Sequence, residues 1–169
     1  MRHSSRLAFV LLAMALIGIA DASYDSYAIY AGQALWCPPP IDGCNTVATS
    51  PYARILGVPL GYLGVIYYVG MVAVSALLAS APLSPSCRAL ALAYATAGVL
   101  ASSVFFYIQA NYIHAFCIYC MVSAFLTVLL FVTSLIHYRR TRNANDVRDG
   151  SSPRLARLSG SQRRLSSSS

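Results

Sequence analysis

The sequence predicts an all-α membrane protein, a bundle of four transmembrane helices with a long extracytoplasmic loop between the first two. Hydrophobic residues make up 57% of the 169-residue chain and charged residues only 10%, whereas charged residues are usually about a quarter of a soluble domain. Four apolar segments are each long enough for a helix to cross roughly 30 Å of hydrocarbon. Because lipid offers the backbone no hydrogen-bond partner, each segment is predicted to be helical.

The four predicted helices cover about residues 7–32, 60–81, 89–109 and 115–137. The first is interrupted late by Asp21 and Asp25, and its beginning also resembles a cleavable signal peptide, an alternative that leaves the other three helices unchanged. Residues 1–138 are therefore expected to form one membrane domain. Residues 139–169 are rich in Arg and Ser and poor in apolar residues, so they are predicted to be a disordered cytoplasmic tail.

Arginine placement predicts how the bundle is oriented. Arginines occur at the N-terminus, in the link between the second and third helices, and directly after the fourth helix, three places on one side of a four-helix topology. The positive-inside rule makes that side cytoplasmic, so both termini are expected inside and the loop of about residues 33–59 outside. The basic tail is interpreted as a topology signal or an anionic-lipid contact, and no nucleic-acid partner is predicted.

This topology divides the five cysteines. Cys37, Cys44, Cys117 and Cys120 fall on the outer side, where disulfides persist, whereas Cys87 falls inside and is interpreted as a bystander. Cys117 and Cys120 form a Cys-x-x-Cys motif at a helix start, where the positive end of the helix stabilises a thiolate. The two loop cysteines can close a small disulfide or swing toward that helix. Two static disulfides or a four-thiolate zinc site are alternatives, but the oxidising side favours redox chemistry and no metal is predicted.

The order and spacing of these residues resemble the vitamin K epoxide reductase family, most closely its prokaryotic disulfide-forming members without a fused thioredoxin domain. The resemblance covers about residues 7–134 and implies a four-helix bundle that encloses a quinone (menaquinone, ubiquinone or vitamin K) near the outer membrane surface. It rests on Cys37 and Cys44, Val47 and Ser50, Gly57-Val58-Pro59 leading into Gly64, and Cys117-Ile118-Tyr119-Cys120.

The resemblance also implies roles for individual residues. Cys117 and Cys120 are the implied active pair, with Cys120 facing the quinone. Cys37 and Cys44 match the relay pair, which receives electrons from a thioredoxin-like partner; the tail contains no cysteine, so this partner is expected in trans. Four residues are predicted to lie near the quinone, although turn, packing or interfacial roles are the ordinary alternatives for them: Ser50 as a hydroxyl donor, and Tyr112, Phe116 and Tyr119 as walls.

The predicted function is a membrane thiol oxidoreductase that oxidises its partner, reduces a quinone and so drives disulfide formation, most simply in a bacterial plasma membrane. Vertebrate family members have Tyr where this chain has Ala124, which disfavours the alternative of a vitamin K epoxide reductase in a membrane of the endoplasmic-reticulum type. A disulfide-stapled, non-enzymatic membrane scaffold is the other alternative. His114 is a candidate proton carrier, and Trp36 is expected to anchor the loop at the membrane interface.

Overall fold

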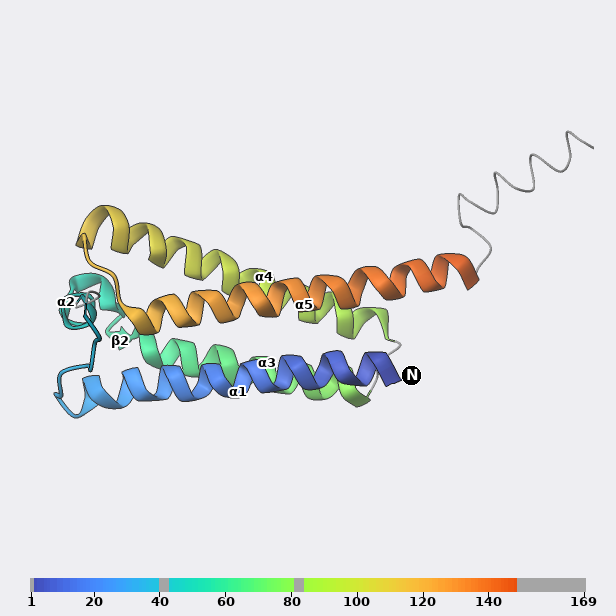
Figure 1. Cartoon of the computed structure of the whole chain (residues 1–169), viewed down its shortest axis with the longest axis horizontal. Helices are drawn as coiled ribbons and strands as arrows, with labels where there is room; N and C mark the ends of the chain where they lie inside the picture. Colours follow the sequence, from blue (N-terminus) through green and yellow to red (C-terminus); the bar gives the residue numbers. More distant parts are fainter. Residues whose placement is uncertain (1, 40–42, 81–83, 149–169) are drawn as a thin grey trace, which may run out of the picture.

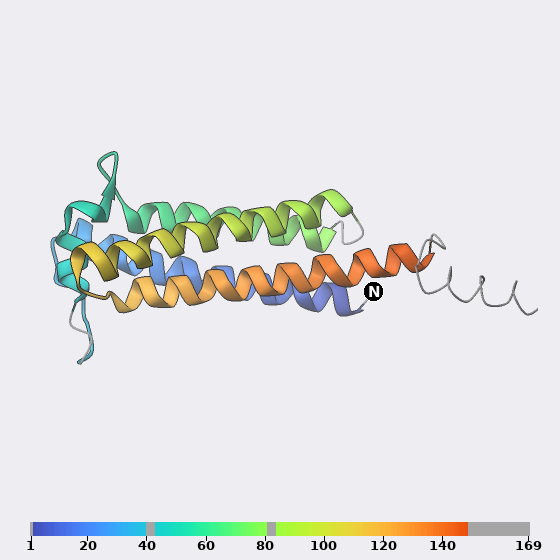
Figure 2. The same ribbon diagram turned by 90° about the horizontal axis from the view of Figure 1, so that it is seen from above.

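The computed structural model describes residues 2–39, 43–80 and 84–148, and four long helices dominate it (Figure 1). They are α1 (Arg2–Tyr30), α3 (Leu60–Ser80), α4 (Pro85–Ile108) and α5 (Ile118–Arg148). Each contributes a segment that is long and apolar enough to cross a membrane. The helices lie side by side in both views, and successive ones run in opposite directions (Figures 1 and 2). The predicted all-α membrane bundle is thus confirmed.

The connection between α1 and α3 folds into short elements that cap one end of the bundle. They are the helix α2 (Cys44–Thr49), the 3-10 turn η1 (Pro51–Ala53), and the strands β1 (Arg54–Ile55) and β2 (Val58–Pro59). The two strands form an antiparallel hairpin in which Ile55 pairs with Val58. These elements lie at the end of the bundle opposite the N-terminus, next to the start of α5 (Figure 1). The long loop and the Cys-x-x-Cys motif therefore share one end of the molecule.

The middle of the bundle is held by an apolar core to which all four long helices contribute. Its fully buried members include Leu11 on α1, Tyr68 and Met71 on α3, Ala95 on α4 and Leu130 on α5. The Tyr68 hydroxyl hydrogen-bonds to the Ser123 hydroxyl at 2.8 Å, which joins α3 to α5 inside the bundle. Packing and internal hydrogen bonds of this kind hold membrane helices together, because lipid is as apolar as the core.

The helix bounds differ from the sequence prediction mainly between α4 and α5. Helix α4 begins at Pro85, because proline suits the first turn of a helix. At its other end it continues as a π-helical turn, η2 (Gln109–Ile113). His114 then adopts a left-handed conformation with φ 55° and ends this helix. The predicted link at 110–114 is therefore mostly helical, and the predicted start of the last helix at residue 115 was too early.

Helix α5 also runs further than the sequence predicted. It continues to Arg148, so residues 139–148 are helical where a disordered tail was expected. A long apolar helix already supplies the nucleus, and arginine is a good helix former, so extending the helix by a few turns costs little. The remainder of that predicted tail, residues 149–169, lies outside the described residues.

Candidate functional site

Four of the five cysteines meet at the capped end of the bundle. Cys44 and Cys117 are buried in one apolar cluster, and Cys37 and Cys120 pack against it. Cys37 and Cys44 form a disulfide with their Cα atoms 6.1 Å apart, whereas Cys117 and Cys120 are free thiols. Cys87 packs against the separate core in the middle of the bundle. Because the disulfide already uses two of the four thiolates, the arrangement does not match the alternative of a four-thiolate zinc site.

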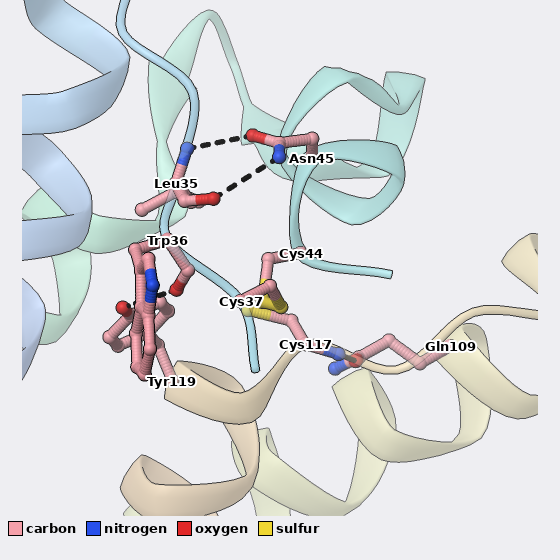
Figure 3. The surroundings of a disulfide bond; sticks show 8 residues. All are labelled: Leu35, Trp36, Cys37, Cys44, Asn45, Gln109, Cys117 and Tyr119. Atoms are coloured by element: carbon pink, nitrogen blue, oxygen red, sulfur yellow. Dashed lines mark hydrogen bonds between the residues drawn. A yellow bond between two sulfur atoms is a disulfide. The ribbon is translucent and has the colours of Figure 1, made fainter. Parts of the chain in front are cut away.

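The segment that contains Cys37 is tied to α2 and α5 by side-chain hydrogen bonds (Figure 3). The Asn45 side chain accepts from the backbone N–H of Leu35 at 2.8 Å and donates to the Leu35 carbonyl at 3.2 Å. The Tyr119 hydroxyl donates to the Trp36 carbonyl at 2.7 Å. Leu35 and Trp36 precede Cys37, and Asn45 follows Cys44. The hydrogen bonds of these residues therefore hold the disulfide beside the first turn of α5.

Gly43 brings the disulfide into close contact with the Cys-x-x-Cys segment. A Cβ atom on Gly43 would lie 2.7 Å from the backbone oxygen of Phe116 and 2.8 Å from its backbone nitrogen. Both distances are shorter than van der Waals contact, so a residue with a side chain does not fit without moving one backbone away from the other. Gly43 and Phe116 directly precede Cys44 and Cys117, so this backbone contact aligns the two cysteines.

Cys117 stands at the N-cap of α5 and is held there through its backbone. Its carbonyl accepts the helical hydrogen bond from Met121 N–H at 3.0 Å, and its own N–H donates to Gln109 Oε1 at 2.9 Å. Gln109 is 2% exposed and comes from the π-helical turn at the end of α4, so it links α4 to the start of α5 (Figure 3). A hydrogen bond from the Cys120 thiol, helped by backbone N–H groups of the first turn, lowers the pKa of Cys117 below its ordinary value. Cys117 is therefore the better thiolate for exchange with a disulfide.

We expect Gln109→Leu to destabilise the protein by about 1–3 kcal/mol, because it leaves the buried N–H of Cys117 without its acceptor. Thermal unfolding in detergent micelles measures this loss. Asn111→Leu is the matched control, since Asn111 lies in the same turn but is exposed and donates only to the Tyr107 carbonyl; its effect should stay within about 0.5 kcal/mol. Equal losses in the two variants would contradict the role given to Gln109.

A cavity of about 380 Å³ lies among the four long helices, and Cys120 is part of its wall. Most of its lining is apolar, including Leu63, Phe105 and Met121. Polar side chains reach it from all four long helices and from the turn beyond α4: Asp21, Asp25, Tyr67, Tyr68, Ser102, Gln109, Tyr119, Ser123 and Thr127. The Tyr67 hydroxyl is buried, and the described residues offer it no hydrogen-bond partner. A cavity of this size and lining suits a flat apolar molecule that bears a few acceptors.

Of the four residues predicted to lie near a quinone, only Tyr119 lines the main cavity. Phe116 packs outside it against Phe106, with ring centroids 5.8 Å apart. Tyr112 is 59% exposed and packs against other tyrosines at the surface. Ser50 shares only a small pocket of about 20 Å³ with Cys120, and its hydroxyl donates to the Val47 carbonyl at 2.8 Å. Phe116, Tyr112 and Ser50 therefore lie outside the main cavity.

Two other residues with predicted roles also lie away from the cavity wall. His114 ends the π-helical turn and is not among the lining residues, so the structure gives no support to a proton-carrying role there. Trp36 is 70% exposed beside Cys37, as an interfacial or partner-facing residue would be.

Sequence reasoning missed the cavity roles of Gln109 and of the two aspartates. In the sequence, Asp21 and Asp25 stand out only as interruptions of an apolar segment. Ionisable residues inside a membrane-spanning helix usually face the bundle interior, and this signal could have placed them in the wall. Gln109 gives a similar signal, as an amide at the end of an apolar run, but its contact with Cys117 depends on the π-helical turn.

Comparison with known proteins supports the same interpretation. The chain matches the vitamin K epoxide reductase family over residues 9–135, a range that contains all four cysteines of the cluster. It is also similar to thiol-disulfide oxidoreductase LTO1 of Arabidopsis thaliana, with 37% identity over 121 residues, or 68% of this chain and 32% of the relative. The chain thus spans about a third of that relative's length. With its four apolar helices and its Cys-x-x-Cys beside an internal cavity, the chain belongs to the vitamin K epoxide reductase family.

Proposed function

We propose that this protein is a membrane thiol oxidoreductase that oxidises a thioredoxin-like partner and passes the electrons to a quinone. Cys37 and Cys44 serve as the relay pair, and Cys117 and Cys120 as the active pair. The observation that supports this most strongly is the chain of contacts from the surface to the cavity. The half-buried Cys37 is bonded to the buried Cys44, which packs with Cys117, and Cys120 lines the cavity wall.

Burial supports an order within the relay pair. Cys37 is half-buried and follows the exposed Trp36, so a thiol of another protein can approach it. Cys44 has no exposed surface and lies in the same cluster as Cys117. In thiol–disulfide exchange the attacking thiolate must reach the disulfide sulfur directly. Cys37 is therefore accessible to a thiol of another protein, whereas Cys44 is accessible only to a thiol inside the cluster. Cys37 accepts the partner's thiolate, and Cys44, once released, is the thiolate left facing the active pair.

The proposed reaction has three steps, two thiol–disulfide exchanges and one reduction of the quinone. The partner's dithiol reduces the Cys37–Cys44 disulfide and becomes a disulfide itself. The Cys44 thiolate then attacks oxidised Cys117–Cys120, and Cys37 completes the transfer, so that the loop pair is again a disulfide. The reduced active pair finally gives two electrons and two protons to the quinone and returns to the disulfide. The net change is one partner disulfide and one quinol formed.

The cavity fits the ring of a quinone. Its volume of about 380 Å³ lies within the usual range for small-molecule sites, and its wall is mostly apolar. Quinone carbonyls are acceptors, and the buried Tyr67 hydroxyl is a donor for which the described residues provide no acceptor. Menaquinone, ubiquinone and vitamin K share this ring chemistry. The arginine distribution supports an orientation with the cysteine cluster on the outer side of the membrane, which we propose to be a bacterial plasma membrane.

The composition of the cavity wall favours simple quinone reduction over epoxide reduction. Ala124 is part of the wall, at the position where vertebrate family members have a tyrosine. A methyl group at this place offers no hydroxyl to hold or protonate an epoxide oxygen. We therefore keep disulfide formation as the proposed activity and treat epoxide reduction as the alternative.

A mixed-disulfide trap tests the partner side of this proposal. Thioredoxin that retains only its attacking cysteine, activated as an aromatic mixed disulfide, is offered to Cys44→Ser protein in which Cys87, Cys117 and Cys120 are also serine. We expect a stable cross-link at Cys37, seen by non-reducing electrophoresis. The matched Cys37→Ser protein presents only the buried Cys44 and should react about tenfold more slowly. Equal rates would contradict the proposed order, and no cross-link in either protein would favour a stapled scaffold.

A further inference from the structure

The cavity that contains Cys120 also contains two carboxyl groups, both from α1. Asp21 and Asp25 are four residues apart, so they lie on one face of the helix, and both line the cavity. They fall inside the membrane-spanning segment Leu7–Tyr30. A carboxylate in a membrane interior costs several kcal/mol, and such residues commonly mark ion or proton pathways. The electron-transfer steps described above give them no role.

Asp25 is held at a defined place between α1 and α3. A Cβ atom on Gly61 would lie 2.7 Å from Asp25 Oδ2 and 3.1 Å from the backbone nitrogen of Ser26. The carboxyl group therefore lies directly against the α3 backbone, in space that only a glycine leaves free. From there Asp25 interacts electrostatically with both Cys117 and Cys120, and Asp21 interacts with Cys120. The two carboxyls thus lie in the wall of the cavity that Cys120 also lines, within electrostatic reach of the active thiols.

Reduction of a quinone needs protons as well as electrons, and the cavity is mostly apolar. Two S–H bonds break, the Cys117–Cys120 disulfide forms, two electrons pass to the quinone, and its two oxygens must each gain a proton. We propose that Asp25, with Asp21 one turn deeper along α1, relays protons released by the active thiols to the quinone oxygens. Each carboxylate accepts a proton from the thiol side and gives it up on the quinone side, so the aspartates are unchanged after each turnover. This role rests on the proposed quinone reduction and adds general acid–base chemistry to it.

The other side chains around Asp21 and Asp25 are less suited to relay protons than the two carboxyl groups. From α3 they face the phenols of Tyr67 and Tyr68, and from α5 Tyr119 and the two active thiols. The polar cavity residues at and beyond α4, Ser102 and Gln109, do not titrate. Phenols release protons only near pH 10 in water, which is too high for a relay at neutral pH. Carboxyl groups are therefore the cavity residues best suited to take up and return a proton during each turnover.

The test compares Asp25→Asn, Asp25→Glu and Asp21→Asn with the wild-type protein in lipid nanodiscs that contain menaquinone. Asparagine keeps the shape of aspartate but cannot transfer a proton. We expect Asp25→Asn to lower the rate of quinol formation about a hundredfold, the usual size of a general acid–base contribution, and Asp21→Asn to lower it less. Asp25→Glu restores a carboxyl and should recover most of the rate, with a shifted pH profile.

Two readouts separate a proton relay from a structural role. Equilibrium binding of menaquinone, and electron transfer from reduced thioredoxin to the Cys117–Cys120 disulfide without quinone, should be unchanged in Asp25→Asn. The infrared difference spectrum of quinone reduction should contain a carboxyl band that Asp25→Asn removes. Wild-type quinol formation by Asp25→Asn, or lost menaquinone binding, overturns the relay. A wild-type protein that makes no quinol overturns the proposed function itself, so the two failures are distinguishable.

Discussion

Replacing Cys120 with serine should abolish quinol formation. Cys120 is the cysteine of the proposed active pair that lines the cavity, and serine cannot form the disulfide that the proposed quinone reduction requires. We expect the rate to fall about a thousandfold or more, as when an essential nucleophile is removed. The measurement is menaquinol formation, followed by absorbance, in nanodiscs supplied with reduced thioredoxin.

Cys87→Ser is the matched control for this experiment. It replaces a cysteine of the same chain, but one that packs with the core in the middle of the bundle, away from the cluster of four. Its quinol formation should match the wild type. Wild-type activity in Cys120→Ser, or a large loss in Cys87→Ser, would contradict the division of the cysteines into an active group and a bystander.

Gly43→Ala should slow electron transfer inside the protein, between the loop pair and the active pair, about a hundredfold. A methyl group on Gly43 would lie 2.7 Å from the Phe116 backbone oxygen, so the loop must move away from the start of α5. A displacement of about 1 Å at a reacting centre can cost this much in rate. Rapid mixing with reduced thioredoxin, followed by acid quench and thiol alkylation, reports the redox state of each cysteine pair separately.

The Gly43→Ala variant should still accept electrons at Cys37 at the normal rate, because the change lies on the side of Cys44. Gly57→Ala is the control, since it adds the same methyl group in the same loop with nothing within 4 Å. Its φ of +84° makes alanine strained there, so it also tests whether general strain in the loop is sufficient. Equal slowing in both variants would contradict a specific contact between Gly43 and Phe116.

The sequence predicted the bundle and the grouping of the cysteines because both follow from simple rules. Hydrocarbon thickness sets helix length, and the order of four helices decides which loops share an end. The same reasoning placed Cys87 apart from Cys117 and Cys120. The start of α5 was harder to predict, since it depends on a π-helical turn and on the left-handed conformation of His114.

The cavity wall could be predicted less well than the cysteines. Phe116 and Tyr119 are three residues apart, yet only Tyr119 reaches the cavity, because Phe116 precedes the helix and turns toward Phe106. Asp21 and Asp25 line the cavity because of how α1 is rotated against α3. Rotation of this kind is set by close contacts such as that at Gly61, which the order of residues does not reveal.

The most direct test of the whole account is the stoichiometry of the wild-type protein in nanodiscs with menaquinone and limiting reduced thioredoxin. We expect one menaquinol for each thioredoxin disulfide formed, with Cys37–Cys44 reduced before Cys117–Cys120. Thioredoxin oxidation without menaquinol, or menaquinol formed while Cys37–Cys44 stays oxidised, would contradict a single electron path through the four cysteines.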